Sequence, residues 1–234
     1  MQEGALTTFK HQHVEEEMDK PIENYWQARL KDLKNALESN NFEVFLADNA
    51  AHAKGVILNE IFPKIGPKSI SWGGTMTLIA TGLYETLKND SSYEVLDTFD
   101  RSLPPEEMTE RRRQALLVDL FFSGTNAVTE RGQLVNLDMI GNRIGGLTFG
   151  PKNVIVLLGR NKIVADLDAA MHRIKNYVAP TNAMRLDMET PCAKTSYCEE
   201  CKAPRRICNT WTITEKCFPK GRVKVVLINE HLGL

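Results

Sequence analysis

Four cysteines near the end of the chain could bind a metal. Cys192, Cys198, Cys201 and Cys208 follow a C-x5-C-x2-C-x6-C spacing. The C-x2-C pair can hold a metal from one turn, and the outer two thiolates can complete a four-thiolate site. The sequence therefore predicts a thiolate-bound metal centre, with an iron–sulfur cluster and zinc as the two alternatives. A redox-active dithiol at the central pair and a set of reduced structural thiols are the competing interpretations.

A glycine turn between a predicted strand and a predicted helix could bind an anion. The strand covers 68–73 and the helix covers 75–87. Glycine lets a ligand approach the backbone, and the free N–H groups of a helix start favour negative charge. Two glycines also permit a tight turn without any ligand, which is the alternative interpretation. The residues predicted to bind a ligand here are Ser71, Gly73, Gly74 and Thr75.

The segment 123–146 carries many hydrogen-bonding side chains between strongly apolar strands. In this segment Arg143 could pair with an anionic substrate. Glu130 precedes a predicted strand and could act as a nucleophile or general base. The alternative is a run of turns in which Asn and Gly adopt positive φ. The ligand-binding residues predicted here are Asn126, Asn136, Asp138, Asn142 and Arg143.

Alternating strands and helices must position these groups. Apolar runs predict strands at 42–47, 68–73, 93–98, 119–124, 133–138, 153–159 and 222–230. Helical spacing predicts a first helix over about 20–40 that begins near Pro21, and further helices at 49–62, 75–87, 104–118 and 162–178, the last ended by Pro180. This alternation predicts an α/β fold with a mostly parallel sheet flanked by helices. We expect a single domain over 1–234, with a cysteine-rich loop at 190–217 before the last strand.

The composition is close to charge balance. The chain has 234 residues, of which 42% are hydrophobic and 25% charged, and its net charge is −1. No basic excess favours nucleic acid. The polar N-terminus lacks the apolar run of a secretory signal, and no stretch approaches the ~20 apolar residues that span a bilayer. We therefore expect a cytoplasmic protein that binds neither nucleic acid nor a membrane and keeps its cysteines reduced.

The blocks SWGGTMTL, GTNAVTERGQLVNLDMIGNRIGGLTFGPKNVIVLLGRNKIV and TPCAKTSYCEECKAPRRICNTW resemble the LUD (lactate utilisation) domain family, in a stand-alone branch with a cysteine-bearing C-terminal segment. The resemblance covers most of the chain, and it implies a fold similar to the glucosamine-6-phosphate deaminase, ribose-5-phosphate isomerase and CoA-transferase superfamily. Some members of the family take part in oxidising lactate to pyruvate alongside iron–sulfur and redox subunits. The run from Thr129 to Gly132 is similar to the Ser-Glu-Asn-Gly motif of CoA-transferases, with Arg131 where Asn is expected.

Three functions follow as hypotheses. The first is a protein that binds a small organic or phosphorylated anion and supports lactate or organic-acid oxidation through a thiolate-bound metal centre, together with redox partner proteins. The second is an acyl- or CoA-transferase, or a sugar-phosphate isomerase, that uses Glu130. The third is a non-catalytic binding or regulatory subunit with a structural zinc. Self-association into a homo-oligomer stays open in all three.

Overall fold

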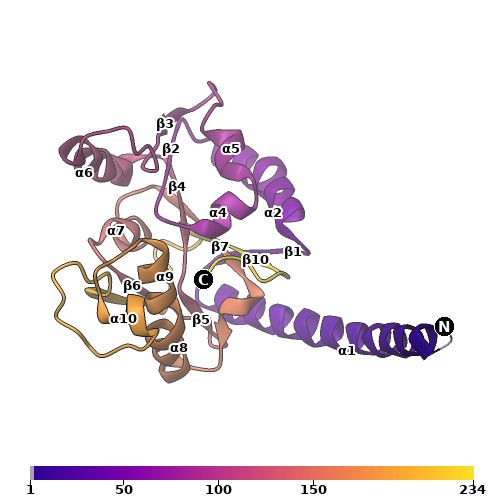
Figure 1. The fold of residues 1–234 in the computed structure, drawn as a ribbon. Coiled ribbons are helices and arrows are strands. Elements are labelled where there is room, and N and C mark those ends of the chain that lie inside the picture. The colour runs from indigo at the N-terminus through magenta and orange to yellow at the C-terminus, as the bar shows by residue number, and fades with distance from the viewer. Residues whose placement is uncertain (1–2) are drawn as a thin grey trace.

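The computed structural model describes the backbone of residues 3–234 and the side chains of residues 18–234. Its centre is a six-stranded sheet whose neighbouring strands all run parallel, in the order β1–β10–β7–β4–β2–β3 (Figure 1). The strands are β1 (Glu43–Ala47), β10 (Val223–Ile228), β7 (Asn153–Gly159), β4 (Leu120–Gly124), β2 (Ser69–Trp72) and β3 (Glu94–Leu96). The predicted α/β fold, with a mostly parallel sheet flanked by helices, is confirmed.

The central strands are buried on both faces. In β7, Val154 and Val156 pack into one hydrophobic core, while Ile155 and Leu157 pack into a second core on the opposite face. This alternation follows from the two-residue period of a strand, and burial on both faces explains why the run is uniformly apolar. The helices α1 (Glu3–Ser39) and α7 (Asn142–Thr148) contribute to the first core, and α2 (Ala50–Val56), α4 (Met76–Ala80) and α5 (Leu83–Leu87) contribute to the second.

A second, four-stranded sheet has the order β8–β5–β6–β9. Its strands are β8 (Ile163–Val164), β5 (Ala127–Thr129), β6 (Leu134–Asp138) and β9 (Thr210–Thr214). β6 pairs antiparallel with both β5 and β9, while β5 and β8 run parallel. The sequence predicted β6 but not the sheet to which it belongs, and β9 lies inside the segment predicted to be a cysteine-rich loop.

The long helix on this second sheet differs from its prediction at both ends. It begins as α8 (Leu167–Arg173) rather than at residue 162, passes through the π-helical turn η4 (Ile174–Val178) and continues as α9 (Ala179–Arg185). The prediction that Pro180 ends the helix is wrong. Pro180 occupies the first turn of α9, immediately after the change in hydrogen-bond register, where a missing N–H is best tolerated.

Three other helices also differ from their predictions. Pro21 lies inside α1 rather than at its start. The helix predicted at 75–87 is split into α4 and α5 because Gly82 adopts a left-handed φ of 71°. The helix predicted at 49–62 runs through Pro63 and stops at Gly66, which has φ 56°.

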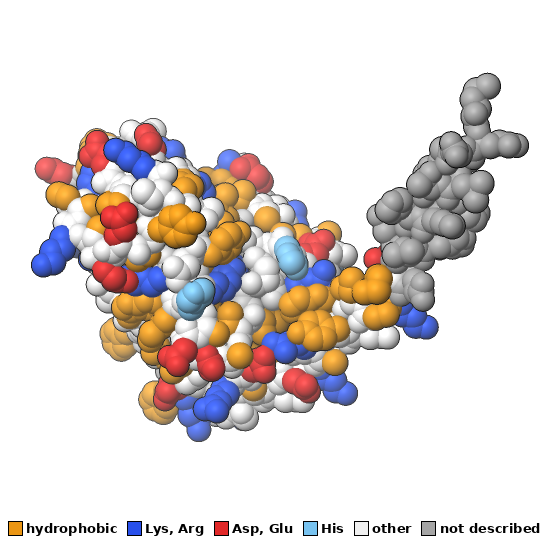
Figure 2. Space-filling model, turned by 60° about the horizontal axis from the view of Figure 1, so that its bottom comes forward, with side chains coloured by type: hydrophobic (Ala, Val, Ile, Leu, Met, Phe, Trp, Pro, Cys, Tyr) orange, Lys and Arg blue, Asp and Glu red, His pale blue; other side chains and the backbone are white. Residues whose placement is uncertain are grey.

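The remaining elements connect these layers. They are η1 (Ile57–Ile61), α3 (Phe62–Ile65), α6 (Pro105–Gln114), η2 (Ala115–Leu117), η3 (Arg160–Lys162) and α10 (Pro191–Thr195). In Figure 1, α1 runs out from the body of the protein. Among the helices described, none has the length and apolar character needed to span a bilayer. Acidic and basic side chains intermingle over the face seen in Figure 2, in agreement with the net charge of −1.

Candidate functional site

The candidate site lies where three neighbouring strands of the main sheet end. Gly73 follows β2, Gly124 ends β4, and Lys162 lies shortly after β7. Because parallel strands point the same way, their carboxyl ends share one edge of the sheet, and open α/β sheets bind their ligands at that edge. We call this group of residues, with Asn126, Asn136, Asp138 and Arg143, the sheet-edge site.

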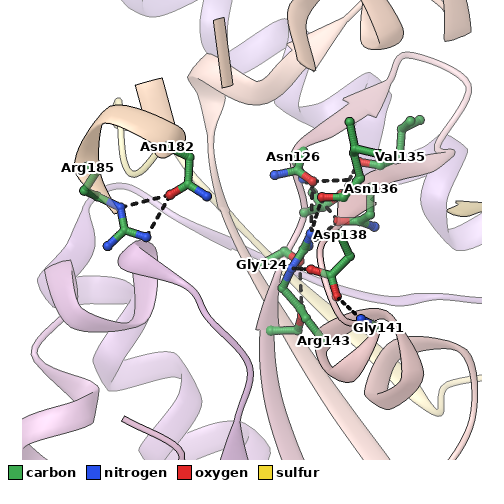
Figure 3. Close-up of polar contacts among 12 residues, drawn as sticks. Gly124, Asn126, Val135, Asn136, Asp138, Gly141, Arg143, Asn182 and Arg185 are labelled. Atoms are coloured by element: carbon green, nitrogen blue, oxygen red, sulfur yellow. Dashed lines mark hydrogen bonds and ion pairs between the residues drawn. The ribbon is translucent and has the colours of Figure 1, made fainter. Parts of the chain in front are cut away.

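Arg143 organises the sheet-edge site. Its side chain is buried, with 7% of the residue exposed. Nη1 donates to the Gly124 carbonyl at 3.1 Å and to Asn136 Oδ1, while Nη2 donates to Asn126 Oδ1 at 3.0 Å and to the Leu137 carbonyl at 3.3 Å. Figure 3 shows the guanidinium reaching up between the two asparagines. The planar fork of arginine suits such a set of acceptors.

The remaining N–H of Arg143 faces Asp138. Nε lies 3.4 Å from Asp138 Oδ1, and the other carboxylate oxygen of Asp138 accepts from the Gly141 N–H at 3.1 Å. Burial lowers the pKa of Arg143, and the Asp138 carboxylate opposes that shift. All five guanidinium N–H groups thus face acceptors within the protein. Arg143 therefore shapes the site and adds positive charge to it, but it has no spare N–H for a substrate.

Two buried polar atoms close to Arg143 have no hydrogen-bond partner among the described residues. They are Thr75 Oγ1 and Asn136 Nδ2. Thr75 is 6% exposed and Asn136 is fully buried. An unpaired buried polar group costs about 1–3 kcal/mol, so such atoms are rare in folded proteins and indicate a missing partner such as a ligand or water.

Gly73 is required for packing against Arg143. A Cβ at this position would lie 2.9 Å from Arg143 Cγ and 3.2 Å from Phe121 Cζ, whereas a Cβ at Gly74 would meet no atom within 4 Å. The two glycines of the turn therefore have different roles. Gly73 lets the Arg143 side chain pack directly against the backbone of the turn, and Gly74 faces open space.

This difference gives a matched pair of variants. We expect Gly73→Ala to lower the free energy of unfolding by about 1–3 kcal/mol, because the added methyl overpacks Arg143. Gly74→Ala should change it by no more than about 0.5 kcal/mol. Urea denaturation followed by circular dichroism measures both. Equal effects of the two substitutions would contradict this account of the turn.

Besides the turn residues Gly73, Gly74 and Thr75, three predicted site residues make no hydrogen bond to Arg143. Ser71 Oγ donates to the Leu96 carbonyl at 2.6 Å, toward β3. Asn142 begins α7 next to Arg143 and is partly exposed. Glu130 lies in the β5–β6 turn, its side chain is 47% exposed, and it pairs with Arg29 of α1.

Glu130 and Asn126 flank opposite ends of β5. Four residue steps along the strand separate their Cα atoms by roughly 13 Å. The structure brings Asn126, Asn136, Asp138, Arg143, Gly73 and Thr75 together, and it does not bring Glu130 to them. The catalytic role of Glu130 stays a prediction.

Lys162 is a candidate functional residue that the sequence did not indicate. It is 4% exposed, and Nζ donates to Thr77 Oγ1 at 3.4 Å. No described carboxylate lies within ion-pair distance of Nζ. Burial, together with the positive charges of Arg173 and Arg143, lowers the pKa of Lys162 to about 7. Its only sequence signal is its position just beyond the carboxyl end of the most apolar strand.

Two further segments enclose Lys162. Arg173 of α8 donates to the Asn126 carbonyl at 2.8 Å and to the Asn161 carbonyl at 3.3 Å. Gly233 packs so closely that a Cβ there would lie 3.2 Å from Lys162 Nζ. The Asn161 side chain donates to the Gly233 carbonyl at 3.1 Å and so holds this last segment in place.

The four clustered cysteines line one small cavity of about 10 Å³. Lys175 and Arg206 also line it, and Arg206 donates to the Cys201 and Cys208 carbonyls at 2.6 and 2.7 Å. All five cysteines of the chain are free thiols. Within the part of the chain that is described, no three His, Cys, Asp or Glu side chains are arranged to hold a metal ion. The predicted thiols thus share one cavity but do not converge to ligand geometry.

Cys217 belongs to a different part of the protein. It is 2% exposed and packs in the first core, where its Sγ accepts from the Val223 N–H at 3.3 Å. Cys217 is therefore a core thiol that provides a control for the other four.

In the cysteine cavity, burial desolvates the Cys198 thiol and raises its pKa.

The cysteine cavity and the sheet-edge site share secondary structure. β9 follows Cys208 and pairs with β6, and the Asn209 N–H donates to the Asp138 carbonyl at 2.9 Å. On the helical side, Lys175 lies two residues after Arg173. It forms an ion pair at 2.7 Å with Glu200 of the cysteine loop. The two features are thus joined through β6 and through the helix that begins with α8.

Residues 30–228 match the family model of the LUD domain. No curated protein matches the chain. Among solved structures, a DUF162 family protein from Deinococcus radiodurans is 11% identical, with 87% of this chain and 97% of that chain covered and a TM-score of 0.44. The delta subunit of eIF2B from Chaetomium thermophilum is 15% identical, with 61% of this chain and 50% of that chain covered and a TM-score of 0.26.

Proposed function

Because the chain belongs to the LUD (lactate utilisation) domain family, we propose that its sheet-edge site binds a small organic or phosphorylated anion in lactate or related organic-acid metabolism. One observation carries this proposal. Lys162 is a buried amine beside two arginines, and no described carboxylate pairs with it. A buried cation without a partner is unfavourable, and an anion would supply the missing partner.

The charge balance of the site supports the same conclusion. Lys162, Arg143 and Arg173 can together contribute three positive charges, and Asp138 is the carboxylate that faces Arg143. The Thr75 hydroxyl and the Asn136 amide nitrogen, which no described residue pairs, add two neutral hydrogen-bonding groups. A carboxylate or phosphate would be stabilised by the positive charge and would find hydrogen-bond donors in these groups.

Isothermal titration calorimetry with lactate, pyruvate and inorganic phosphate tests this proposal. We expect at least one of these anions to bind, and we expect Lys162→Met to weaken that binding by about 10-fold or more, because hydrogen bonds to charged groups contribute about 1.5–3 kcal/mol. Lys220→Met, at an exposed lysine, is the control and should bind normally. Binding at pH 8 should also take up a proton, since the anion favours the charged form of Lys162. No binding to the wild type, or equal affinity in wild type and Lys162→Met, would contradict the proposal.

We also propose that Cys192, Cys198, Cys201 and Cys208 hold one metal centre. The support is that all four line the same cavity, with Lys175 and Arg206 available to offset thiolate charge. Coordination would require the four thiol side chains to move closer together than they are in this structure.

Metal analysis of protein purified without oxygen tests this second proposal. We expect iron with sulfide, or one equivalent of zinc, in the wild type. Cys201→Ser should lose most of the metal, whereas Cys217→Ala should retain it because Cys217 lies in the core away from the cavity. Protein that contains neither metal, or equal loss in both variants, would rule out the shared centre.

A further inference from the structure

The chemistry available to Lys162 goes beyond electrostatic attraction. Its amine is buried and close to a hydroxyl, with Thr77 Oγ1 at 3.4 Å, and no described acid pairs with it. A desolvated amine next to other cations has an unprotonated fraction at neutral pH and is therefore nucleophilic. An arginine at this position could bind an anion equally well, but it could not provide this nucleophile.

We propose that Lys162 forms a Schiff base with the carbonyl group of a 2-oxo acid bound at the sheet-edge site. This inference rests on the proposed function, because the same site would bind the carboxylate of the ligand. A 2-oxo acid carries its carboxylate and its carbonyl on adjacent carbons. Such a ligand would match a site in which two arginines lie near one amine that is partly unprotonated at neutral pH.

The reaction balances without any oxidant or reductant. The lone pair of Lys162 Nζ attacks the carbonyl carbon, a C–N bond forms as the π bond of the carbonyl breaks, and the oxygen takes that electron pair and one of the amine protons. The C–O bond of this carbinolamine then breaks, the second C–N bond forms, and the oxygen leaves as water with the other amine proton. The Thr77 hydroxyl is placed to relay these protons.

The neighbouring groups fit the ligand as well as the reaction. The positive charges of Arg143 and Arg173 favour a carboxylate near the amine. Thr75 Oγ1 and Asn136 Nδ2 are buried and have no partner among the residues that the structure describes, so they can hydrogen-bond a ligand without giving up one of these contacts. Gly233 packs against one side of the amine, since a Cβ at this position would lie 3.2 Å from Nζ.

Reductive trapping tests the Schiff base. The full-length protein is incubated with pyruvate and sodium borohydride, digested, and mapped by mass spectrometry. We expect the peptide that contains Lys162 to gain the mass of pyruvic acid less water plus two hydrogens. Lactate has the same carboxylate but no carbonyl, so it should give no adduct. Lys162→Arg keeps the positive charge and should also give none.

Calorimetry on the same samples separates the two proposals. If pyruvate binds and no adduct forms at Lys162, the Schiff base is wrong and the anion site stands. If pyruvate neither binds nor is trapped, and lactate and phosphate also fail to bind, both proposals are wrong. Adducts spread over exposed lysines, or unchanged trapping in Lys162→Arg, would overturn the assignment to Lys162.

Discussion

Lys162→Met is expected to stabilise the protein at pH 6 and to lose this advantage progressively as the pH rises from about 7 to 10.5. In the folded wild type the pKa of Lys162 falls from 10.5 to about 7 because the amine is buried beside Arg143 and Arg173. That difference corresponds to a free-energy penalty on the order of 5 kcal/mol. Methionine fills a similar space and carries no charge, so the variant does not have this penalty.

The pH window follows from the two pKa values. Between pH 7 and 10.5 the unfolded wild type binds more protons at this lysine than the folded protein does, so the stability of the wild type rises with pH across this range. Below pH 7 both states are protonated and the full penalty is present. Above pH 10.5 both states are neutral at this position, and the penalty disappears.

Chemical denaturation of wild type and Lys162→Met at a series of pH values measures this effect. Lys220→Met, at an exposed lysine, provides the matched control and should follow the wild type throughout. A stability difference between wild type and Lys162→Met that is independent of pH would show that folding does not lower the pKa of Lys162.

Arg143→Ala is expected to be the most destabilising single substitution in the sheet-edge site. It removes the donors that satisfy Gly124, Asn126, Asn136 and Leu137, and it leaves Asp138 without its ion-pair partner. Breaking a buried charge pair by removing one partner costs about 3–5 kcal/mol. Arg143→Lys should recover little of this loss, since an ammonium group cannot reproduce the five-donor fork.

Arg113→Ala provides the control for this prediction. Arg113 lies on α6, its side chain is 76% exposed, and it pairs with Glu110 at 3.6 Å. Exposed ion pairs contribute about 0–1 kcal/mol, so the control should remain close to the wild type in urea denaturation. Similar losses in the two variants would mean that the network around Arg143 adds little to stability.

The main sheet could be predicted because its strands carry strong local signals. The run from Val154 to Leu158 is apolar at every position, which is typical of a parallel strand buried on both faces. The second sheet could not be predicted in the same way. β8 has only two residues, and β9 has no buried residue and lies in a segment dominated by cysteines and charges. Their pairing depends on contacts between distant parts of the chain.

The candidate site was predicted in part for a similar reason. The polar run at 123–146 identified Asn126, Asn136, Asp138 and Arg143, which the structure brings into one network. The sequence did not indicate that Arg143 uses all its donors internally, because the acceptors include the backbone carbonyls of Gly124 and Leu137. Lys162 was missed because its unusual properties come from burial and from two arginines that lie far from each other in the sequence.

The bond between Asn209 and Asp138 has a consequence for communication within the protein. It anchors the start of β9 to the strand that carries the carboxylate partner of Arg143. If the proposed anion site and the proposed metal centre both bind their ligands, reordering of the cysteine segment on metal binding would shift the strand that carries Asp138, and anion binding would in turn act on the cysteine segment. Thermodynamic reciprocity requires the two effects on binding to be equal in size. A metal-dependent change in anion affinity would thus be matched by an anion-dependent change in metal affinity.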